Sequence, residues 1–412
     1  MEYGCIGERL THSFSKEIHK CLADYEYEIK EIPKDKLGEF MTAAEFRAIN
    51  VTIPYKQAVM PYLYEISDTA KRIGAVNTIV NRDGKLYGYN TDFFGMTALI
   101  EKSGIEIQNK KVLILGSGGT SKTAQAVAES LEAAEIYVVS RKSGNGLITY
   151  EEMYEGHTDA EIIINTTPLG MFPNPDAMPV DLTRFPKLNG VVDAIYNPLR
   201  SRLVLEAESL GIKATGGLYM LVAQAAYAVE KFIGTPTTIE KNNGVYKELL
   251  KEKQNLILIG MPGSGKSTLG KRISELTGRP FLDTDELIVK KSGKTIPEIF
   301  SEIGEEGFRE IEAEVIKEIG NLGGYVIATG GGAVLRHENV MTLKANGIVY
   351  YIDRPLQWLT ATEDRPLSSN RTDLEKRYNE RYEIYKSTAD VTISAVDNLK
   401  ENVDMILKSE GK

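Results

Sequence analysis

Two glycine-rich loops, each placed directly after a short apolar run and before an amphipathic segment, constrain the fold of this chain most. The first lies in KKVLILGSGGTSKTAQAVAESL (110–131) and the second in NLILIGMPGSGKSTLGKRISEL (255–276). Each pattern predicts a buried strand, a glycine turn and a helix, which is how an α/β nucleotide-binding unit begins. We therefore expect two such units in the 412 residues, a length that suits two or three domains.

Apolar and β-branched runs predict strands that alternate with helical segments along the whole chain. The clearest helix is the apolar stretch 216–234, and the charged stretch 240–254 is interpreted as a partly helical linker without a buried apolar run, with the main boundary near 252. This alternation is typical of parallel sheets covered on both faces. The expected strands lie in EYEIKEI (26–32), FRAINVTI (46–53), VNTIVN (76–81), LYGYN (86–90), EIYVVS (135–140), AEIIINTT (160–167), GVVDAIY (190–196), ILIG (257–260), FLD (281–283), YVIATG (325–330), IVYYID (348–353) and VTIS (391–394).

Composition and charge narrow the function classes. The formal charge is 49 − 58 = −9, which disfavours general nucleic-acid binding. No apolar run is long enough to span a membrane, and the start of the chain lacks the basic and apolar regions of a signal peptide. Cys5 and Cys21 give no disulfide framework and no CxxC pair. We expect a soluble, cytoplasmic protein without zinc that acts on small molecules and has no nucleic-acid or membrane partner; a homodimer is left open.

The second loop matches a complete phosphate-binding motif. Residues 260–267 read GMPGSGKS, which fits GxxxxGK[ST]. Backbone N–H groups of such a loop converge on phosphate oxygens, Lys266 can reach the β- and γ-phosphates, and the Ser267 hydroxyl can ligate Mg²⁺. The sequence therefore predicts ATP as a ligand, with Mg²⁺, at a loop formed by Gly263, Ser264, Gly265, Lys266, Ser267 and Thr268.

Further motifs follow that loop: FLDTDE (281–286), GEEGFREIE (304–312), TGGGAVL (329–335), DRPL (364–367) and ERYEIY (380–385). With them, residues 254–412 resemble shikimate kinase along essentially their whole length. The resemblance implies that Asp285 orients or deprotonates the attacking hydroxyl and that Asp283 completes the Mg²⁺ shell. It further implies that Arg365 binds ATP and stabilises the transferring phosphoryl group. The remaining substrate-binding residues it implies are Arg309 and Arg381, which would hold a carboxylate, with Gly331 and Gly332.

The first loop only partly fits GxGxxG, because Ser121 takes the sixth place. After the next strand, where an NAD enzyme needs an acid for the ribose, the chain has Ser140, Arg141 and Lys142. Two cations and a hydroxyl suit a 2′-phosphate, so the sequence favours NADP over NAD. The predicted NADP-binding residues in this part of the chain are Gly116, Ser117, Gly118, Gly119, Ser140, Arg141 and Lys142.

Motifs on both sides of this loop extend the pattern: THSFSKEIH (11–19), AINVTIPYK (48–56), IGAVNTIV (73–80), GYNTDFFG (88–95), IINTTPLGM (163–171), VVDAIYNPL (191–199) and GGLYMLVAQAA (216–226). Together they resemble shikimate dehydrogenase over residues 1–240. The resemblance implies a catalytic dyad of Lys56 and Asp92, with a lysine ammonium as proton donor to a ring ketone. It also implies a set of substrate- and cofactor-binding residues: Ser13, Ser15, Thr52, Asn77, Tyr196 and Gln224 for the substrate, and Gly217 and Met220 for NADP.

Both halves together predict a bifunctional enzyme that reduces 3-dehydroshikimate to shikimate with NADPH and then phosphorylates shikimate to shikimate 3-phosphate with ATP. The expected fold is α/β: a substrate domain (1–95, completed by helices of about 216–240), a Rossmann-like NADP domain (96–215), a linker (241–253) and a P-loop kinase domain with a parallel sheet (254–412). Two alternatives stay open. The first half could use NAD and quinate, or both halves could serve as shikimate-type sensors without turnover.

Overall fold

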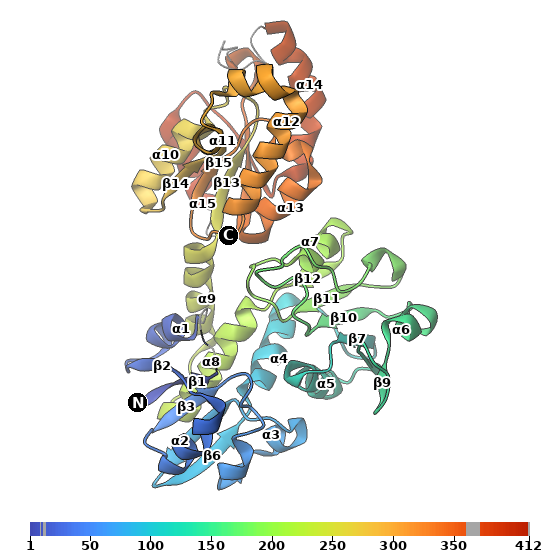
Figure 1. The fold of residues 1–412 in the computed structure, drawn as a ribbon, viewed down its shortest axis with the longest axis vertical. Coiled ribbons are helices and arrows are strands. Elements are labelled where there is room, and N and C mark those ends of the chain that lie inside the picture. The colour runs from blue at the N-terminus through green and yellow to red at the C-terminus, as the bar shows by residue number, and fades with distance from the viewer. Residues whose placement is uncertain (9, 11–13, 360–370, 411–412) are drawn as a thin grey trace. The chain divides into compact units, whose positions relative to one another are not determined.

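The chain divides into two compact parts, each described here by itself. The computed structural model describes residues 1–8, 10, 14–359 and 371–410. The two parts are Met1–Glu248 and Leu249–Lys412, called here the N-terminal unit and the C-terminal unit (Figure 1). Within the described residues, no helix combines the length and the apolar character that crossing a membrane would require.

The N-terminal unit contains two six-stranded sheets. The first is mixed and has the order β2-β1-β3-β5-β6-β4; β1, β2 and β3 are parallel, while β5 runs antiparallel to both β3 and β6. Its strands are β1 (Tyr3–Gly7), β2 (Tyr27–Glu31), β3 (Ala48–Val51), β4 (Glu65–Ile66), β5 (Thr78–Arg82) and β6 (Lys85–Tyr89).

The second sheet is parallel throughout, as the sequence predicts. Its strands are β7 (Lys111–Leu115), β8 (Glu135–Val139), β9 (Leu147–Ile148), β10 (Ile162–Asn165), β11 (Gly190–Asp193) and β12 (Lys213–Thr215). The order is β12-β11-β10-β7-β8-β9, which is the doubly wound order 3-2-1-4-5-6. The chain reverses direction across the sheet between β7 and β10, and ligands bind at such a point.

Helices cover both faces of the second sheet. Apart from the helix that begins at Ile239, the α-helices of the N-terminal unit are α1 (Ser15–Leu22), α2 (Leu37–Ala43), α3 (Asp68–Ile73), α4 (Thr91–Ser103), α5 (Gly119–Ser130), α6 (Tyr150–Gly156), α7 (Arg202–Ser209) and α8 (Leu218–Ile233). Side chains of α4, α5 and α8 form a buried cluster with one face of the sheet, and side chains of α6 and α7 form another with the opposite face. Helix α8 also packs on the first sheet through Phe232, so it joins the two lobes of the unit (Figure 1).

The C-terminal unit has one parallel five-stranded sheet in the order β14-β15-β13-β16-β17. The strands are β13 (Asn255–Ile259), β14 (Phe281–Asp283), β15 (Val326–Ala328), β16 (Gly347–Asp353) and β17 (Val391–Ser394). The helices are α10 (Lys266–Thr277), α11 (Thr284–Ser292), α12 (Ile296–Ile319), α13 (His337–Asn346), α14 (Arg371–Thr388) and α15 (Leu399–Ser409). Alternate residues of β13 face α10 and α15 on one side and α12, α13 and α14 on the other. A strand whose two faces are both buried is apolar along its whole length, which is why the continuous apolar runs of this unit predict its strands.

All strands predicted from the sequence are present, but four strands were not predicted. Three of these, β4, β9 and β12, have only two or three residues. The fourth, β1, has five residues that are all buried. It lies between β2 and β3 and is parallel to both. Its sequence, YGCIG, is short and rich in glycine, so its strand conformation comes from its neighbours rather than from local propensity.

The predicted linker is a continuous helix. Residues 241–253 lie in α9 (Ile239–Lys253), and the division after Glu248 falls inside it. The stretch has no continuous apolar run, but two of its apolar residues are buried: Val245 is 5% exposed and Leu249 is 3% exposed. Such residues at i and i+4 lie on one helix face, a pattern that the many charged residues of the segment hide.

Each end of α9 is fixed within its own unit. In the N-terminal unit, the Tyr246 ring meets the Tyr219 ring edge-on with centroids 5.3 Å apart, and the Lys102 ammonium lies 4.7 Å from the Tyr219 centroid. In the C-terminal unit, the Arg279 guanidinium donates to the backbone carbonyl of Lys251. The helix is therefore part of both units.

A buried carboxylate fixes the strand ends at the switch point of the second sheet. Asp193, the last residue of β11, is fully buried. It accepts hydrogen bonds from Asn165 Nδ2 and Ile195 N, both at 3.0 Å, and from Ser201 Oγ at 2.5 Å. Burial raises the pKa of Asp193 to about 6, although these hydrogen bonds act in the opposite direction.

This pKa predicts a pH dependence of stability. Because the pKa of Asp193 in the folded unit lies above the ordinary value of 3.8, the folded unit gains stability at low pH and loses it as the pH rises through about 6. The loss amounts to about 3 kcal/mol at 1.36 kcal/mol per pKa unit. Asp193→Asn keeps the hydrogen bonds of the protonated form without titrating. Denaturant unfolding at pH 4 and pH 7 measures the free energy of unfolding of the N-terminal unit in both proteins. Relative to wild type, the variant should be more stable at pH 7 than at pH 4; an equal difference at both pH values would contradict this prediction.

Candidate active sites

The N-terminal unit encloses a cavity of about 620 Å³ that both lobes line. From the first lobe it receives residues that follow β1 and β3, the residue before β5 and a residue at the start of α4. From the second lobe it receives residues of α5, α8 and the loops after β10 and β11. The lining residues that the sequence singled out are Ser15, Thr52, Lys56, Asn77, Asp92, Tyr196, Gly217, Met220 and Gln224. Ser13, which the sequence also singled out, lies outside the described residues.

Lys56 and Asp92 meet in this cavity. Lys56 follows β3 after the turn at Pro54, and Asp92 lies in the first turn of α4, whose N-cap is Asn90. Lys56 Nζ donates to Asp92 Oδ2 at 2.6 Å, and the two side chains are 23% and 15% exposed. An ammonium paired with a carboxylate and reachable from a cavity can donate a proton to a bound oxygen.

The side chains around this pair are mostly hydrogen-bonding groups. Asn77 is 3% exposed and donates to Thr91 Oγ1 at 3.1 Å, while Gln224 accepts from the same hydroxyl at 3.3 Å. Burial raises the pKa of Tyr196, which keeps its phenol protonated and able to donate. The site can therefore offer several neutral hydrogen-bond partners to a polyhydroxylated ligand.

The first glycine loop joins β7 to α5 beside the end of β8. Gly116 and Ser117 follow the strand, and Gly118 and Gly119 lie at the start of α5. The hydroxyls of Ser117 and Ser140 lie 3.3 Å apart, so the loop is next to the segment that continues with Arg141 and Lys142. Both cations are exposed. The helix start and these cations together form a site for anionic groups.

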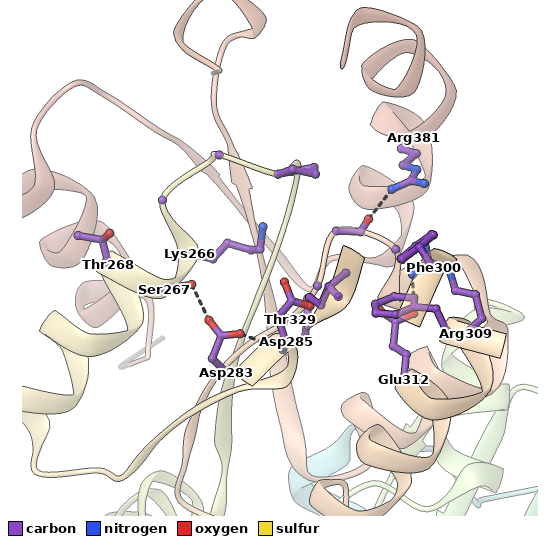
Figure 2. A pocket seen from close by; sticks show the side chains of 18 residues that line it. Lys266, Ser267, Thr268, Asp283, Asp285, Phe300, Arg309, Glu312, Thr329 and Arg381 are labelled. Atoms are coloured by element: carbon purple, nitrogen blue, oxygen red, sulfur yellow. Dashed lines mark hydrogen bonds and ion pairs between the residues drawn. The ribbon is translucent and has the colours of Figure 1, made fainter. Parts of the chain in front are cut away.

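The C-terminal unit has a cavity of about 340 Å³ at the carboxyl ends of its strands. Figure 2 shows phosphate-loop residues on one side, Arg309 and Arg381 on the other, and Asp285 and Thr329 between them. Of the predicted residues, those that line it are Gly263, Gly265, Lys266, Ser267, Thr268, Asp283, Asp285, Arg309, Gly331, Gly332 and Arg381. Ser264 lies in the same loop and is 2% exposed. Arg365 lies outside the described residues.

The second glycine loop ends at the first residue of α10. Gly265, its N-cap, has φ of +90°, a conformation open to glycine at little cost. The Lys266 side chain is buried and its Nζ donates to the carbonyl oxygens of Gly260 and Met261 at 2.9 and 3.0 Å. Backbone N–H groups at this helix start are available to phosphate oxygens.

Ser267 and Asp283 meet beside that loop. Ser267 Oγ donates to Asp283 Oδ2 at 2.6 Å, and Asp283 Oδ1 accepts from the backbone N–H of Asp285 at 3.0 Å. Asp283 ends β14 and caps α11, so Asp285 lies in the first turn of that helix. A hydroxyl and a carboxylate oxygen beside a phosphate loop are ligands of the kind that Mg²⁺ takes.

Arg309 is held by two glutamates. Its Nη1 lies 2.7 Å from Glu312 Oε2 and its Nη2 lies 3.1 Å from Glu305 Oε1. Glu312 is fully buried, and burial raises the pKa of its carboxyl although Arg309 acts to lower it. A Cβ on Gly332 would lie 2.2 Å from both terminal nitrogens of Arg309, so the guanidinium packs directly on this glycine and a larger residue would displace it.

Arg381 approaches the same glycine turn from α14. Its Nη1 donates to the Gly331 carbonyl at 3.0 Å, and Tyr385 one turn later donates to the same oxygen. Arg309 and Arg381 thus both border the cavity beside Gly331 and Gly332 (Figure 2). Two guanidinium groups at one end of a cavity suit an anionic group such as a carboxylate.

Several lining residues were not among those predicted for the sites. In the C-terminal cavity they include Phe300, Phe308, Glu312 and Thr329, and the spacing of Glu312 from Arg309 at i+3 was the available signal. In the N-terminal cavity they include Cys5, Asn50 and Met171. Asn50 stands inside the motif AINVTIPYK, so its presence there could have been anticipated.

Comparisons with known proteins agree with this geometry. Residues 5–79 match the family model of the shikimate dehydrogenase substrate binding domain, and residues 262–409 match the shikimate kinase model. A curated shikimate dehydrogenase (NADP(+)) from Clostridium beijerinckii is 41% identical over 245 residues, which is 55% of this chain and 90% of that protein. Another of the same name, from Geobacillus kaustophilus, is 34% identical over 271 residues, 60% of this chain and 98% of that protein.

Solved structures resemble the same part of the chain. A chorismate mutase/shikimate 5-dehydrogenase fusion protein from Clostridium acetobutylicum has a TM-score of 0.57 at 36% identity, covering 60% of this chain and 96% of that one. Shikimate 5-dehydrogenase from Thermus thermophilus, solved with NADP(H) and shikimate, has a TM-score of 0.55 at 27% identity, covering 60% of this chain and 99% of that one.

The fold and the two cavities define a two-module enzyme, with an oxidoreductase of the doubly wound class and a P-loop phosphotransferase in one chain. The chain belongs to the shikimate dehydrogenase family and also carries a shikimate kinase domain. Both resemblances that the motifs indicated are thereby confirmed.

Arg309 and Arg336 each pair with a glutamate, but only the Arg309–Glu312 pair is buried. We therefore expect their alanine variants to lose different amounts of unfolding free energy. Arg309→Ala leaves the buried Glu312 carboxylate without its partner, and we expect it to lower the unfolding free energy of the C-terminal unit by about 3–5 kcal/mol. Arg336 pairs with Glu310 at 2.6 Å, but those side chains are 33% and 66% exposed. Arg336→Ala should therefore cost under about 1 kcal/mol.

The two variants are compared by chemical denaturation at neutral and acidic pH. The loss in Arg309→Ala should shrink at acidic pH, because Glu312 with its raised pKa then becomes protonated and needs no counter-ion. Equal losses in both variants would show that burial of this pair has no energetic consequence.

Proposed function

We propose that the chain reduces 3-dehydroshikimate to shikimate with NADPH in its N-terminal unit and phosphorylates shikimate with ATP in its C-terminal unit. The observation that carries the proposal is the presence of two different sets of chemical groups in one chain. One is the Lys56–Asp92 pair in a cavity rich in hydrogen-bond partners, and the other is the phosphate loop facing two arginines.

In the N-terminal unit, Lys56 acts as the proton donor. NADPH supplies the hydride to the ring carbonyl carbon when it is bound. As the carbonyl oxygen gains negative charge, Lys56 Nζ gives it a proton, and Asp92, 2.6 Å away, holds the ammonium in place. Thr52, Asn77 and Gln224 orient the ring by hydrogen bonds; Ser13 and Ser15 would hold the carboxylate.

The cofactor is bound by the second lobe. Gly116, Ser117, Gly118 and Gly119 receive the pyrophosphate at the start of α5. Ser140, Arg141 and Lys142 receive the 2′-phosphate, a group that would be poorly matched by the acid of an NAD site. Tyr196, Gly217 and Met220 line the cavity where the nicotinamide ring meets the substrate.

In the C-terminal unit, positioning and charge stabilisation carry the reaction. The phosphate loop with Lys266 and Thr268 holds the ATP phosphates, and Arg365 would stabilise the transferring group. Asp285 orients the attacking hydroxyl and accepts its proton. Arg309 and Arg381 hold the substrate carboxylate, with Gly331 and Gly332 beside it.

Mg²⁺ would be held by Ser267 and Asp283, whose oxygens lie 2.6 Å apart. Within the described residues no group of three His, Cys, Asp or Glu side chains could hold a metal ion. This fits an ion that takes its other ligands from ATP phosphates and water, which is usual for Mg²⁺. The ion would neutralise charge that develops between the β- and γ-phosphates.

The division of labour follows the predicted domains. We assign substrate binding for the dehydrogenase to residues 1–95 with helices of 216–240, NADP binding to 96–215, and kinase activity to 254–412. Residues 241–253 join the modules as part of α9. A cytoplasmic location is part of this proposal, which leaves a homodimer open.

One assay with two matched variants tests both activities. The full chain receives 3-dehydroshikimate, NADPH, ATP and Mg²⁺, and NADPH loss and ADP formation are followed separately. Lys266→Ala should keep consuming NADPH and accumulate shikimate without forming ADP. Lys56→Ala should lose about 10²–10⁴-fold in reductase kcat, the usual contribution of a positioned acid, and should form ADP only when shikimate itself is added.

Two exposed lysines serve as controls, Lys71 on α3 of the N-terminal unit and Lys271 on α10 of the C-terminal unit, with side chains 59% and 58% exposed. Their alanine variants should behave as wild type. A wild-type chain that binds these ligands without turnover would be a sensor instead, and a preference for NAD with quinate would reassign the first half. Either result overturns the proposal.

The choice of cofactor predicts a second, independent effect. Arg141→Ala should weaken NADP binding by about 1.5–3 kcal/mol, the size of a hydrogen bond to a charged group. NAD binding should hardly change, because NAD has no 2′-phosphate. Titration of the full chain with each cofactor measures the difference, and equal weakening of both would mean that Arg141 serves another purpose.

A further inference from the structure

A chain of buried polar side chains runs from the edge of the first sheet to the cavity of the N-terminal unit. Tyr27 on β2 donates to Asn50 Oδ1 at 2.7 Å, and Asn50 Nδ2 donates to Thr78 Oγ1 at 3.1 Å. Thr78 Oγ1 in turn lies 3.1 Å from Asn77 Oδ1. Tyr27 and Thr78 are 4% and 0% exposed, and neither lines the cavity.

Two backbone groups fix the orientation of the Asn77 and Asn50 side-chain amides. The backbone N–H of Thr91 can only donate, and it lies 2.7 Å from one side-chain atom of Asn77, which must therefore be the oxygen. The backbone carbonyl of Asn77 can only accept, and it lies 3.4 Å from one side-chain atom of Asn50, which must therefore be the nitrogen. These backbone partners therefore assign which atom of each amide is the nitrogen and which is the oxygen.

The oxygen of Asn77 is consequently surrounded by protein donors. It accepts from the Thr91 N–H at 2.7 Å, and the hydroxyls of Thr78 and Thr91 lie 3.1 and 3.3 Å from it. These two hydroxyls also lie 3.2 Å from each other, and either can donate to the other. Asn77 Nδ2 donates one proton to Thr91 Oγ1. Its second N–H has no partner among the described residues, and Asn77 lines the cavity.

The orientation of the Gln224 amide on α8 is fixed in the same way. Gln224 Nε2 lies 3.1 Å from the Leu221 carbonyl, so it is the nitrogen, and Gln224 Oε1 accepts from Thr91 Oγ1 at 3.3 Å. Gln224 also lines the cavity. Both amides therefore keep one N–H for a ligand while their oxygens bind protein donors.

We infer that Thr78, with Tyr27 and Asn50 behind it, is a positioning residue that turns the Asn77 amide so that the cavity receives a hydrogen-bond donor. The inference rests on the proposed function, in which Asn77 contacts the substrate. A donor at this place recognises a substrate oxygen as an acceptor. Without the Thr78 hydroxyl, the Asn77 oxygen keeps one donor fewer and can turn toward the cavity, where it would oppose a substrate oxygen.

The test compares three substitutions in the full chain. Thr78→Val has nearly the same shape but no hydroxyl, and it should raise the KM for shikimate about tenfold, the effect of one hydrogen bond. The KM for NADP and the kinase activity of the same chain should stay at wild-type values. Thr78→Ser restores the hydroxyl and should return the KM to within about twofold of wild type, while Tyr27→Phe should shift the KM in the same direction as Thr78→Val but less.

Thr97→Val is the matched control. Thr97 lies on α4 in the same unit, its hydroxyl donates to the Phe93 carbonyl in its own helix at 2.9 Å, and it does not line the cavity. It should leave all kinetic constants unchanged. Thermal unfolding of every variant is followed alongside, so that a general loss of folding appears as a fall in kcat and in melting temperature rather than in KM alone.

The outcomes separate this inference from the proposed function. If wild type does not oxidise shikimate, the proposed function fails first. If wild type is active and Thr78→Val has an unchanged KM, or if Thr78→Val and Thr78→Ser are impaired equally, the positioning role is refuted while the proposed function stands.

Discussion

Each unit depends on one strand that is buried on both faces and has a parallel neighbour on either side. In the N-terminal unit this strand is β7, and in the C-terminal unit it is β13. Parallel neighbours satisfy its backbone hydrogen bonds, and apolar side chains of the helices cover both faces. Polar groups are thereby confined to the strand ends, which is why the glycine loops, Asp193 and Asp283 all gather at carboxyl ends.

Strand positions followed well from the sequence where burial was complete. The runs that became β7, β10, β13 and β16 are apolar and β-branched, and burial on both faces is what such runs require. β1 escaped because two of its five residues are glycine, so its strand conformation depends on pairing with β2 and β3. Pairing between segments distant in the chain leaves no local pattern.

For the sites too, the sequence indicated some properties and not others. Motifs gave the identities of Lys56, Asp92, Lys266 and Arg309, because each chemistry needs particular residue types. They could not give the state of those groups, such as the protonation tendency of buried Glu312 or the direction in which Asn77 presents its amide. Those properties arise from burial and from partners on other elements, namely α11 and α14 around Glu312 and β3, β5 and α4 around Asn77.

The course of α9 bears on how the two activities could ever be separated. A cut anywhere in residues 241–253 opens a hydrogen-bonded helix. A cut before Val245 also takes Val245 and Tyr246 from the N-terminal unit, and a cut after Leu249 takes that buried residue from the C-terminal unit. Splitting the gene within this charged stretch would thus yield two fragments whose ends unfold and expose apolar side chains. Recombination between the halves of related fusions should tolerate crossovers outside this helix more readily than within it.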